Sequence, residues 1–275
     1  MESKYEKTPK NNIVDINDFD LCNYDMTKIY YYAALYCIEK DIRCPAIYLG
    51  NIENKCVYCG TADGRKVIAL DKNIDVDTQI AALLSSLSKG ANETIELSIP
   101  KESAMFRNDM STLYLYAASL AQSLHVSCPL IIEEDEYNKS LSTYAVAINE
   151  SNSGKCRLIA IRSSWPDNMV QTFISMAHEV RHVWQHSNRQ RAQRYFNYYM
   201  SPEEISDRHA YRMQKAEIDA NAYAYRIMKD IFGIDIIQKK LLYDDTEAVK
   251  MVKAASEKIF PSYCDSLKTL GKCLF

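Results

Sequence analysis

The chain has 275 residues, of which 47% are hydrophobic and 25% are charged, a balance that excludes a disordered or fibrous protein. Its 33 lysine and arginine residues and 36 aspartate and glutamate residues give a formal net charge of -3, whereas a dedicated nucleic-acid binder normally carries a basic surplus. Seven glycines and seven prolines are too few for a loop-rich all-β protein. One large domain or two small domains are both compatible with the length.

The residues from Met1 to Asp20 are polar and contain no apolar core of a secretory signal. No run of about 18 apolar residues predicts a membrane span. The nine cysteines are an odd number without the spacing of a disulfide framework. We therefore expect reduced thiols and a cytoplasmic protein with no membrane partner.

Two segments of the chain resemble each other at an offset of 84 residues, 26–49 and 110–133. A later match joins residues 67–70 to residues 158–161. Such self-similarity predicts an internal duplication, with chance likeness of two amphipathic units as the alternative. The matched residues include Tyr30 with Tyr114, and Cys44-Pro45 with Cys128-Pro129.

In each copy, the residue pattern predicts a helix, a group of short strands and a second helix. The first helix of each copy has apolar residues at helical spacing and ends before the Cys-Pro step, since the residue before proline avoids helical geometry. The expected elements in chain order are helix 26–40, strands 46–49, 55–59 and 66–71, helix 77–88, strand 94–99, helix 110–124, strands 130–132, 142–148 and 155–162, and helix 168–186.

This order predicts an α+β fold in which two lobes of similar helix, small sheet and helix follow one another. We expect residues 1–24 to form a flexible N-terminus, residues 25–100 a degenerate, non-catalytic repeat lobe, and residues 101–275 the domain that carries the chemistry.

His178-Glu179-Val180-Arg181-His182 forms the H-E-x-x-H pattern on the expected helix 168–186. Residues four apart share one face of a helix, so both imidazoles can bind one metal ion, and Glu179 stands beside them where it can take a proton from a metal-bound water. We therefore predict a zinc (Zn2+) site, with a coincidental polar helix face as the alternative. The corresponding stretch of the first copy, from Ser85 to Lys89, has no imidazole and no carboxylate.

Catalytic zinc usually has three protein ligands, so a third is needed. His186 lies one further turn along the same straight helix, and reaching the metal would strain it. His209 follows Asp207 and Arg208 in a polar context typical of a surface residue. Glu217 is the better candidate, with an ordinary solvated helix glutamate as the alternative.

The residues from Ser201 to Glu204 predict the start of a helix, with an N-cap serine, a proline at the first position and a capping-box glutamate. This helix is expected to run to Phe232 and to stop at Gly233. Asn221 lies one turn after Glu217 on the same face, and its amide oxygen could accept the outer N–H of a ligand histidine. Asp219 points elsewhere and is expected to be a surface residue.

H-E-x-x-H followed by E-x-D/E-A-N-x-F/Y-A, here the residues from Glu217 to Ala224, resembles the ImmA/IrrE family of zinc metallopeptidases. The resemblance runs from Met110 to Phe232 and implies a compact zincin-like fold. It also implies His178, His182 and Glu217 as zinc ligands and Glu179 as the general base. The chain departs from the family pattern in a long spacer, rich in tyrosine and arginine, between His182 and Glu217. It also lacks the helix-turn-helix module of some relatives.

Two weaker patterns have simple explanations. Cys56-Val57-Tyr58-Cys59 resembles a zinc knuckle, but a closed structural site needs four ligands and no second pair follows at suitable spacing, so a hairpin with reduced thiols is favoured. Arg189, Arg191 and Arg194 form a basic cluster that could meet an acidic substrate or nucleic acid, although a solvated loop is the usual explanation.

These residues together predict a zinc-dependent endopeptidase that cleaves a protein substrate, and the resemblance suggests a regulator or repressor as that substrate. Glu179 would take the proton of the zinc-bound water and pass it to the leaving amine. A tyrosine among Tyr195, Tyr198 and Tyr199 could stabilise the oxyanion, and all three remain open. The alternative is a metal-binding, non-proteolytic interaction module on a metallopeptidase scaffold.

Overall fold

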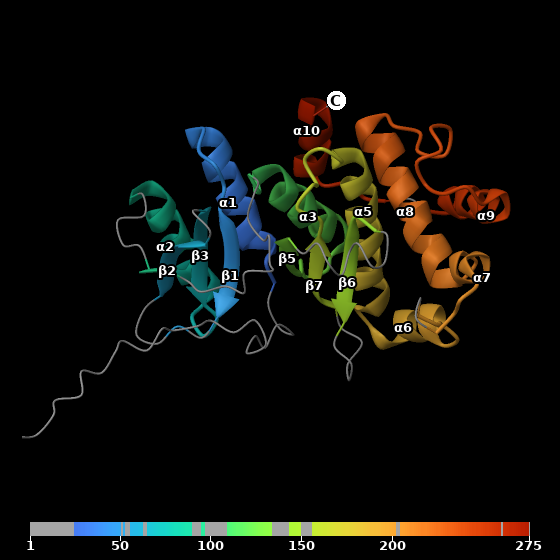
Figure 1. Cartoon of the computed structure of the whole chain (residues 1–275), viewed down its shortest axis with the longest axis horizontal. Helices are drawn as coiled ribbons and strands as arrows, with labels where there is room; N and C mark the ends of the chain where they lie inside the picture. The colour runs from blue at the N-terminus through green and yellow to red at the C-terminus, as the bar shows by residue number, and fades with distance from the viewer. Residues whose placement is uncertain are drawn as a thin grey trace, which may run out of the picture.

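The chain folds into a mixed α+β structure with two small sheets, as a computed structural model shows (Figure 1). The described residues are 25–50, 52, 56–62, 65–89, 95–96, 109–133, 143–149, 156–201, 204–259 and 261–274. The expected N-terminus 1–24 lies outside them. Within the described ranges, every helix is too short or too polar to cross a bilayer.

Helices and short strands, the strands mostly in groups of three, follow one another up to α5, and the described elements after α5 are all helices. They are α1 (Thr27–Lys40), β1 (Ala46–Gly50), β2 (Val57–Ala62), β3 (Arg65–Asp71), α2 (Val76–Lys89), β4 (Ile95–Glu96), α3 (Ser111–Leu124), β5 (Leu130–Glu133), β6 (Ala145–Asn149), β7 (Cys156–Ile161), α5 (Met169–His186), α6 (Arg189–Phe196), α7 (Arg208–Arg212), α8 (Lys215–Phe232), α9 (Thr246–Ser256) and α10 (Asp265–Leu274). The helices and strands expected from periodicity up to residue 186 are therefore present, with ends shifted by a few residues.

The two sheets share strand order and strand direction. The first has the order β1-β3-β2-β4 and the second the order β5-β7-β6. In each, the first strand runs parallel to the third, with Ala46 opposite Val67 and Leu130 opposite Leu158. In each, the second strand along the chain, β2 or β6, pairs antiparallel with the third, β3 or β7. A helix then follows, α2 in one lobe and α5 in the other.

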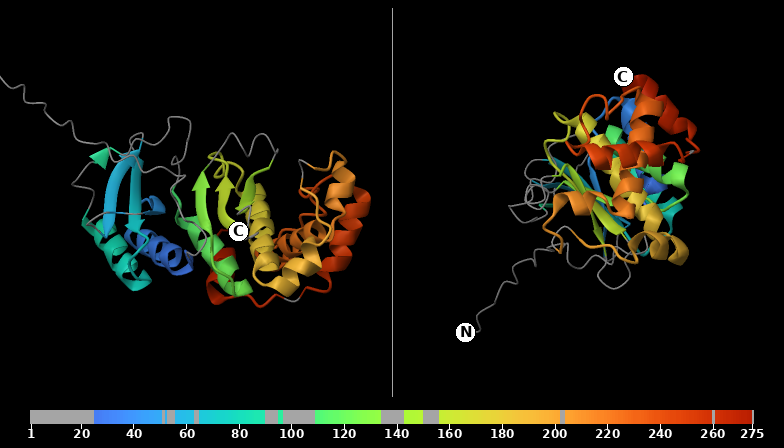
Figure 2. Two further views of the ribbon diagram at one scale, coloured as in Figure 1. Left: turned by 90° about the horizontal axis from the view of Figure 1, so that it is seen from below. Right: turned by 90° about the vertical axis from the view of Figure 1, so that its right-hand side faces the viewer.

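The lobes meet through α1 and α3, which lie side by side (Figure 2). The fully buried rings of Tyr30 and Tyr114 stack with centroids 3.9 Å apart. Each hydroxyl accepts a backbone N–H from the other lobe's first strand: Ile131 donates to Tyr30 at 2.8 Å, and Ile47 donates to Tyr114 at 3.0 Å. The contact is thus reciprocal, and one continuous hydrophobic core spans both lobes.

The Cys-Pro steps join the same reciprocal interface. The N–H of Cys44 donates to Asp109 Oδ1, and the N–H of Cys128 donates to Asp25 Oδ1, both at 3.0 Å. These bonds connect residues more than 60 positions apart in the chain. They hold the start of each lobe's first strand against the first helix of the other lobe.

The helix expected from Ser201 to Phe232 is wrong at its start. The capping turn does form, since the N–H of Ser201 donates to Glu204 Oε2 at 2.7 Å. Asp207, however, caps the separate short helix α7, and α8 begins only after Gln214, whose backbone is extended. A second capping residue downstream therefore restarts the helix and overrides the first signal. The stop is as expected, because Gly233 adopts a left-handed φ of 67°.

Helices α6 to α9 build the side of the second lobe that lies far from the first lobe. Helix α5 packs against β6 and β7 on one side and against α8 on another, and α9 packs on α8. Figure 1 and Figure 2 show α8 and α9 at the end of the molecule opposite α2. This arrangement places α5 between a sheet and a second helix, which is the setting of the candidate site.

Candidate metal centre

Helices α5 and α8 come close because small residues line the contact. Ala216, Ala220 and Ala224 are fully buried on α8 and leave room for the side chains of α5. The first turn of α8 carries Glu217, which is 3% exposed. The third and fourth turns of α5 carry His178 and His182.

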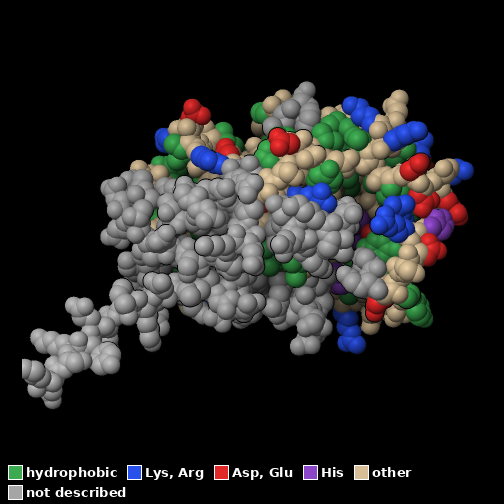
Figure 3. Space-filling view, in the orientation of Figure 1, with side chains coloured by type: hydrophobic (Ala, Val, Ile, Leu, Met, Phe, Trp, Pro, Cys, Tyr) green, Lys and Arg blue, Asp and Glu red, His purple; other side chains and the backbone are tan. Residues whose placement is uncertain are grey.

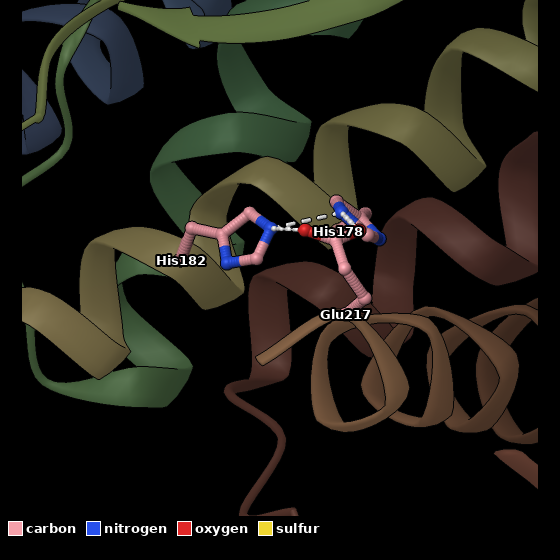
Figure 4. Close-up of side chains that lie close together, drawn as sticks. All are labelled: His178, His182 and Glu217. Carbon is pink, nitrogen blue, oxygen red and sulfur yellow. Dashed lines mark hydrogen bonds and ion pairs between the residues drawn. The ribbon is translucent and has the colours of Figure 1, made fainter. Parts of the chain in front are cut away.

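One cluster with metal-ligand chemistry stands out among the described residues, formed by His178, His182 and Glu217 (Figure 4). The Nε2 atoms of the two histidines lie 2.9 Å apart. The Glu217 carboxylate oxygens lie 3.3 Å from Nε2 of His178 and 3.4 Å from Nε2 of His182. A tetrahedral zinc ion with ligands at about 2.0–2.1 Å holds its ligand atoms about 3.3 Å apart. The cluster therefore fits one such ion.

The outer nitrogen of His178 is fixed by Asn221. Its Nδ1 lies 3.1 Å from Asn221 Oδ1. The Asn221 amide cannot be turned round, because its Nδ2 donates to the backbone oxygen of Glu217 at 2.9 Å. His178 is therefore the donor at Nδ1, which leaves Nε2 to face the cluster as a potential metal ligand.

Gln185 does the same for His182, a role that the sequence patterns did not reveal. Gln185 Oε1 lies 2.7 Å from Nδ1 of His182, and its Nε2 donates to the oxygen of Ala216 and to Asp219. Gln185 is fully buried, so this orientation is held by protein groups alone. Two imidazole lone pairs and a carboxylate thus converge, an arrangement that only a cation or a proton stabilises.

The protonation of these groups reflects that convergence. Burial raises the pKa of Glu217, but the charges and hydrogen bonds of His178 and His182 outweigh it and hold the pKa well below its usual range. Burial lowers the pKa of His182, but hydrogen bonding to Glu217 and the charges of Glu217 and Glu179 raise it to about 9. In the metal-free chain a proton thus takes the cation's place.

Glu179 connects the cluster to the second sheet. Its Oε2 accepts the backbone N–H of Ala147 in β6 at 3.0 Å. Burial is the main cause that raises the pKa of Glu179, and the charges of His178 and His182 act against it. Among the described strands, β6 lies at the end of the second sheet and pairs with β7 on one side. Glu179 therefore stands between the ligand helix and the strand at the edge of the sheet.

Two tyrosines complete the surroundings of Glu217. Tyr199 and Tyr211 donate to Glu217 Oε1 at 3.0 and 2.9 Å, and their hydroxyls lie 3.1 Å apart. Of the three candidate oxyanion donors, Tyr199 is thus the one that touches a cluster residue, while Tyr198 is 91% exposed. Tyr211 was not expected from the sequence, and no spacing rule links a residue of α7 to Glu217.

The expectation that Asp219 is a surface residue is wrong. Its side chain is 15% exposed and forms a paired salt bridge with Arg181 at 2.8 and 3.1 Å. Asp219 also accepts hydrogen bonds from Gln185 and from the hydroxyl of Tyr195. The cause is a buried arginine inside the H-E-x-x-H motif, which needs a carboxylate partner. Asp219 supports Gln185 and, through it, His182.

The two other candidate histidines lie apart from the cluster. His186 stacks on Phe196 at 3.8 Å, and burial together with His182 lowers its pKa to about 4. His209 is exposed and lies 3.0 Å from Asp245. Figure 3 shows histidine, aspartate and glutamate side chains gathered at the right-hand edge of this face. These placements agree with a packed residue and a surface residue, respectively.

Cys56 and Cys59 lie on the first lobe, where Cys56 is exposed and Cys59 is partly buried. They are not part of a group of three or more potential metal ligands in the described portion of the chain. Cys59 lies in β2, opposite Ile68 of β3. The hairpin interpretation therefore agrees with the structure.

In comparisons of the whole chain with known proteins, no family model, curated protein or solved structure matches it.

Proposed function

We propose that the chain is a zinc-dependent endopeptidase that cleaves a protein substrate. The observation that carries the proposal is the convergence of two imidazole nitrogens and one carboxylate, beside a fourth titratable group, Glu179. A site of two histidines and one glutamate is typical of catalytic zinc, since three protein ligands leave a position open. Bound zinc would lower the pKa of a water molecule and polarise the scissile carbonyl.

Glu179 is the group that would move the proton. Its Oε2 is held by the N–H of Ala147, which leaves Oε1 to take a proton and to return it to the leaving amine. Its raised pKa suits both steps, because a base must release the proton again. Since Glu179 follows His178 directly in the chain, the ligand and the base are held by one helix.

The edge of the second sheet offers a place for an extended peptide. β6 pairs with β7 on one side and contacts α5 near Glu179 on the other. An edge strand can bind a peptide through backbone hydrogen bonds, which give affinity without demanding a particular side chain; since Glu179 takes the N–H of Ala147, the peptide would pair with the rest of this edge. Tyr199 and Tyr211 lie on the Glu217 side of the cluster, and Tyr199 is our choice for the oxyanion donor.

We further propose that the two lobes arose by duplication and that residues 101–275 form a zincin-like domain of the ImmA/IrrE type. The shared strand order, the shared strand directions and the reciprocal tyrosine contact support the duplication. The motif from Glu217 to Ala224 supports the family assignment. The first lobe would then serve in packing or in substrate recognition.

The test is a comparison of the wild-type chain with Glu179→Gln. Both are incubated with cell lysate, new peptide termini are mapped, and bound metal is measured. We expect Glu179→Gln to keep its zinc and to lose cleavage, because the substitution removes the base and no ligand. Glu247→Gln, a surface change outside the cluster, serves as the control and should cleave normally. Equal cleavage by wild type and Glu179→Gln would rule out Glu179 as the general base. Zinc binding without any new termini would favour the non-proteolytic alternative.

A further inference from the structure

A second candidate site lies on another face of α5. A pocket of about 770 Å³ opens between α5, α6, α8 and α9, and none of the three cluster residues lines it. Ligand pockets for small molecules have volumes of about 300–1,000 Å³. The space therefore suits one small molecule better than a long segment of chain.

The pocket is strongly basic in a chain whose net charge is -3. Five lysine and arginine residues and one aspartate are among its lining residues. The aspartate, Asp219, is bound to Arg181. The other four cations form no ion pair with a carboxylate in the described part of the chain; they are Arg191, Arg194, Lys215 and Lys258. Cations that gather without counter-charges attract an anion carrying more than one charge.

The floor of the pocket is apolar and aromatic. Trp184, Tyr195 and Met251 line it beside the cations, and all three side chains are at least partly exposed. The guanidinium of Arg181 lies 3.6 Å from the centre of the Trp184 ring, and that of Arg191 lies 4.3 Å from it. Because Arg181 is held by Asp219, Arg191 is the stacked guanidinium that is not paired with a carboxylate, and stacking keeps its orientation fixed, which suits binding of phosphate oxygens.

We propose that this pocket binds a small phosphorylated molecule with an apolar ring body, of the size and charge of a nucleoside diphosphate. Arg191, Arg194, Lys215 and Lys258 take the phosphates, and the aromatic floor takes the ring. The site is separate from the metal centre and holds whether or not the chain is a peptidase. Arg181 and Asp219 form the wall between the two sites, since Asp219 also supports Gln185.

The test is calorimetric titration of the full chain with ADP, pyrophosphate and adenosine. We expect ADP to bind, pyrophosphate to bind more weakly and adenosine to bind very weakly, with all ADP binding reduced by added salt. The variant Arg194→Ala/Lys258→Ala removes two exposed cations of the pocket and should weaken ADP binding by about tenfold or more. The matched control is Lys250→Ala/Lys253→Ala, which removes two exposed lysines of α9 outside the pocket and should bind as wild type.

ADP can also contact a bound metal, so the titration is repeated with His178→Ala, which should bind ADP unchanged. Loss of ADP binding in that variant would place the ligand at the metal centre and overturn the proposal. Equal weakening by the pocket pair and the control pair would do the same, as would no binding of ADP at millimolar concentration. Binding of an acidic peptide in place of ADP would reject the small-molecule ligand.

Discussion

Helices α2 and α5 occupy the same place in their lobes, and of the two only α5 carries histidines of the candidate metal centre. Counted from the first residue of each helix, Ser85 corresponds to His178, and Lys89 to His182. The difference does not end with these residues. After α5 the chain adds α8, which brings Glu217, whereas the described chain after α2 continues with the short strand β4. A shared scaffold is thus insufficient, because the centre also needs a second ligand helix.

The same comparison shows where each lobe keeps its polar interior. The second lobe buries Arg181, Gln185 and Glu217 around the cluster. Arg181 and Gln185 both bond to Asp219, and Gln185 and Glu217 both contact His182. In the first lobe, the buried Gln79 of α2 donates to the backbone oxygen of Asp71 and so closes a local turn. These three buried residues therefore support the candidate metal centre in the second lobe, whereas Gln79 supports the backbone in the first.

The largest expected effect is the loss of all bound metal in His178→Ala, measured as zinc per chain. Wild type should hold one zinc, because α2 has Ser85 and Lys89 where α5 has its two histidines. His186→Ala is the control on the same helix and should keep the zinc, since His186 stacks on Phe196. Zinc that survives in His178→Ala would show that the lobes differ less than we propose.

Gln185→Leu should weaken zinc binding by about 10–100-fold, because His182 loses the acceptor that fixes its ring. Gln79→Leu makes the same type of substitution at the buried glutamine of α2, at a different position in the helix, and should leave zinc affinity unaltered. Affinity is measured by competition with a chelator. An equal effect of both variants would mean that general destabilisation, rather than the support of His182, is responsible.

Zinc affinity should rise about tenfold per pH unit below the pKa of His182, because zinc displaces one proton there. The pKa of about 9 lies above the usual value, so the proton stabilises the metal-free fold at low pH and is lost as the pH rises through 9. Titration of zinc at pH 7 in buffers of different ionisation enthalpy should report release of about one proton. Zinc affinity that is independent of pH from 6 to 8 would contradict this.

A smaller effect, a loss of folding stability, is expected from the two reciprocal tyrosines, and it should be equal for both. Tyr30→Phe and Tyr114→Phe each leave one buried backbone N–H without its acceptor, and each should lower the free energy of unfolding by about 1–2 kcal/mol. Urea unfolding measures the change, and Tyr32→Phe on the exposed face of α1 is the control. A large difference between the two variants would reject the symmetry of the contact.

For the last variant we expect no change in zinc content. Cys56→Ser/Cys59→Ser should leave the zinc content at one per chain, because no third ligand accompanies the pair in the described first lobe. A second zinc that depends on this pair would reveal a structural site in the first lobe.

The repeated elements could be predicted because local signals agree with the tertiary structure. Helical spacing of apolar residues marked α1 and α3, and the Cys-Pro steps marked where they end. The order of elements, repeated after 84 residues, then indicated two lobes of one kind. The pairing of β1 with β3, which skips β2 in the chain order, follows from no local pattern.

The candidate site was predictable only where its residues share a helix. His178 and His182 are four residues apart, and Glu217 and Asn221 are too, so the spacing alone aligns them. Tyr211 and the pair of Arg181 with Asp219 come together through folding of the long segment between α5 and α8. The capping signal at Ser201 misled for the same reason, because a local turn does not determine how far the helix after it extends.

The reciprocal tyrosines have a consequence for the history of the chain. A patch in which each side gives the other the same residue is the contact of a two-fold symmetric homodimer. If the lobes descend from one ancestor, that ancestor assembled as a pair of identical subunits, and fusion made the pair permanent. Joining the subunits would have removed any dependence of the pair on protein concentration. It would also have allowed the two lobes to diverge, so that the candidate ligands are found on one of them only.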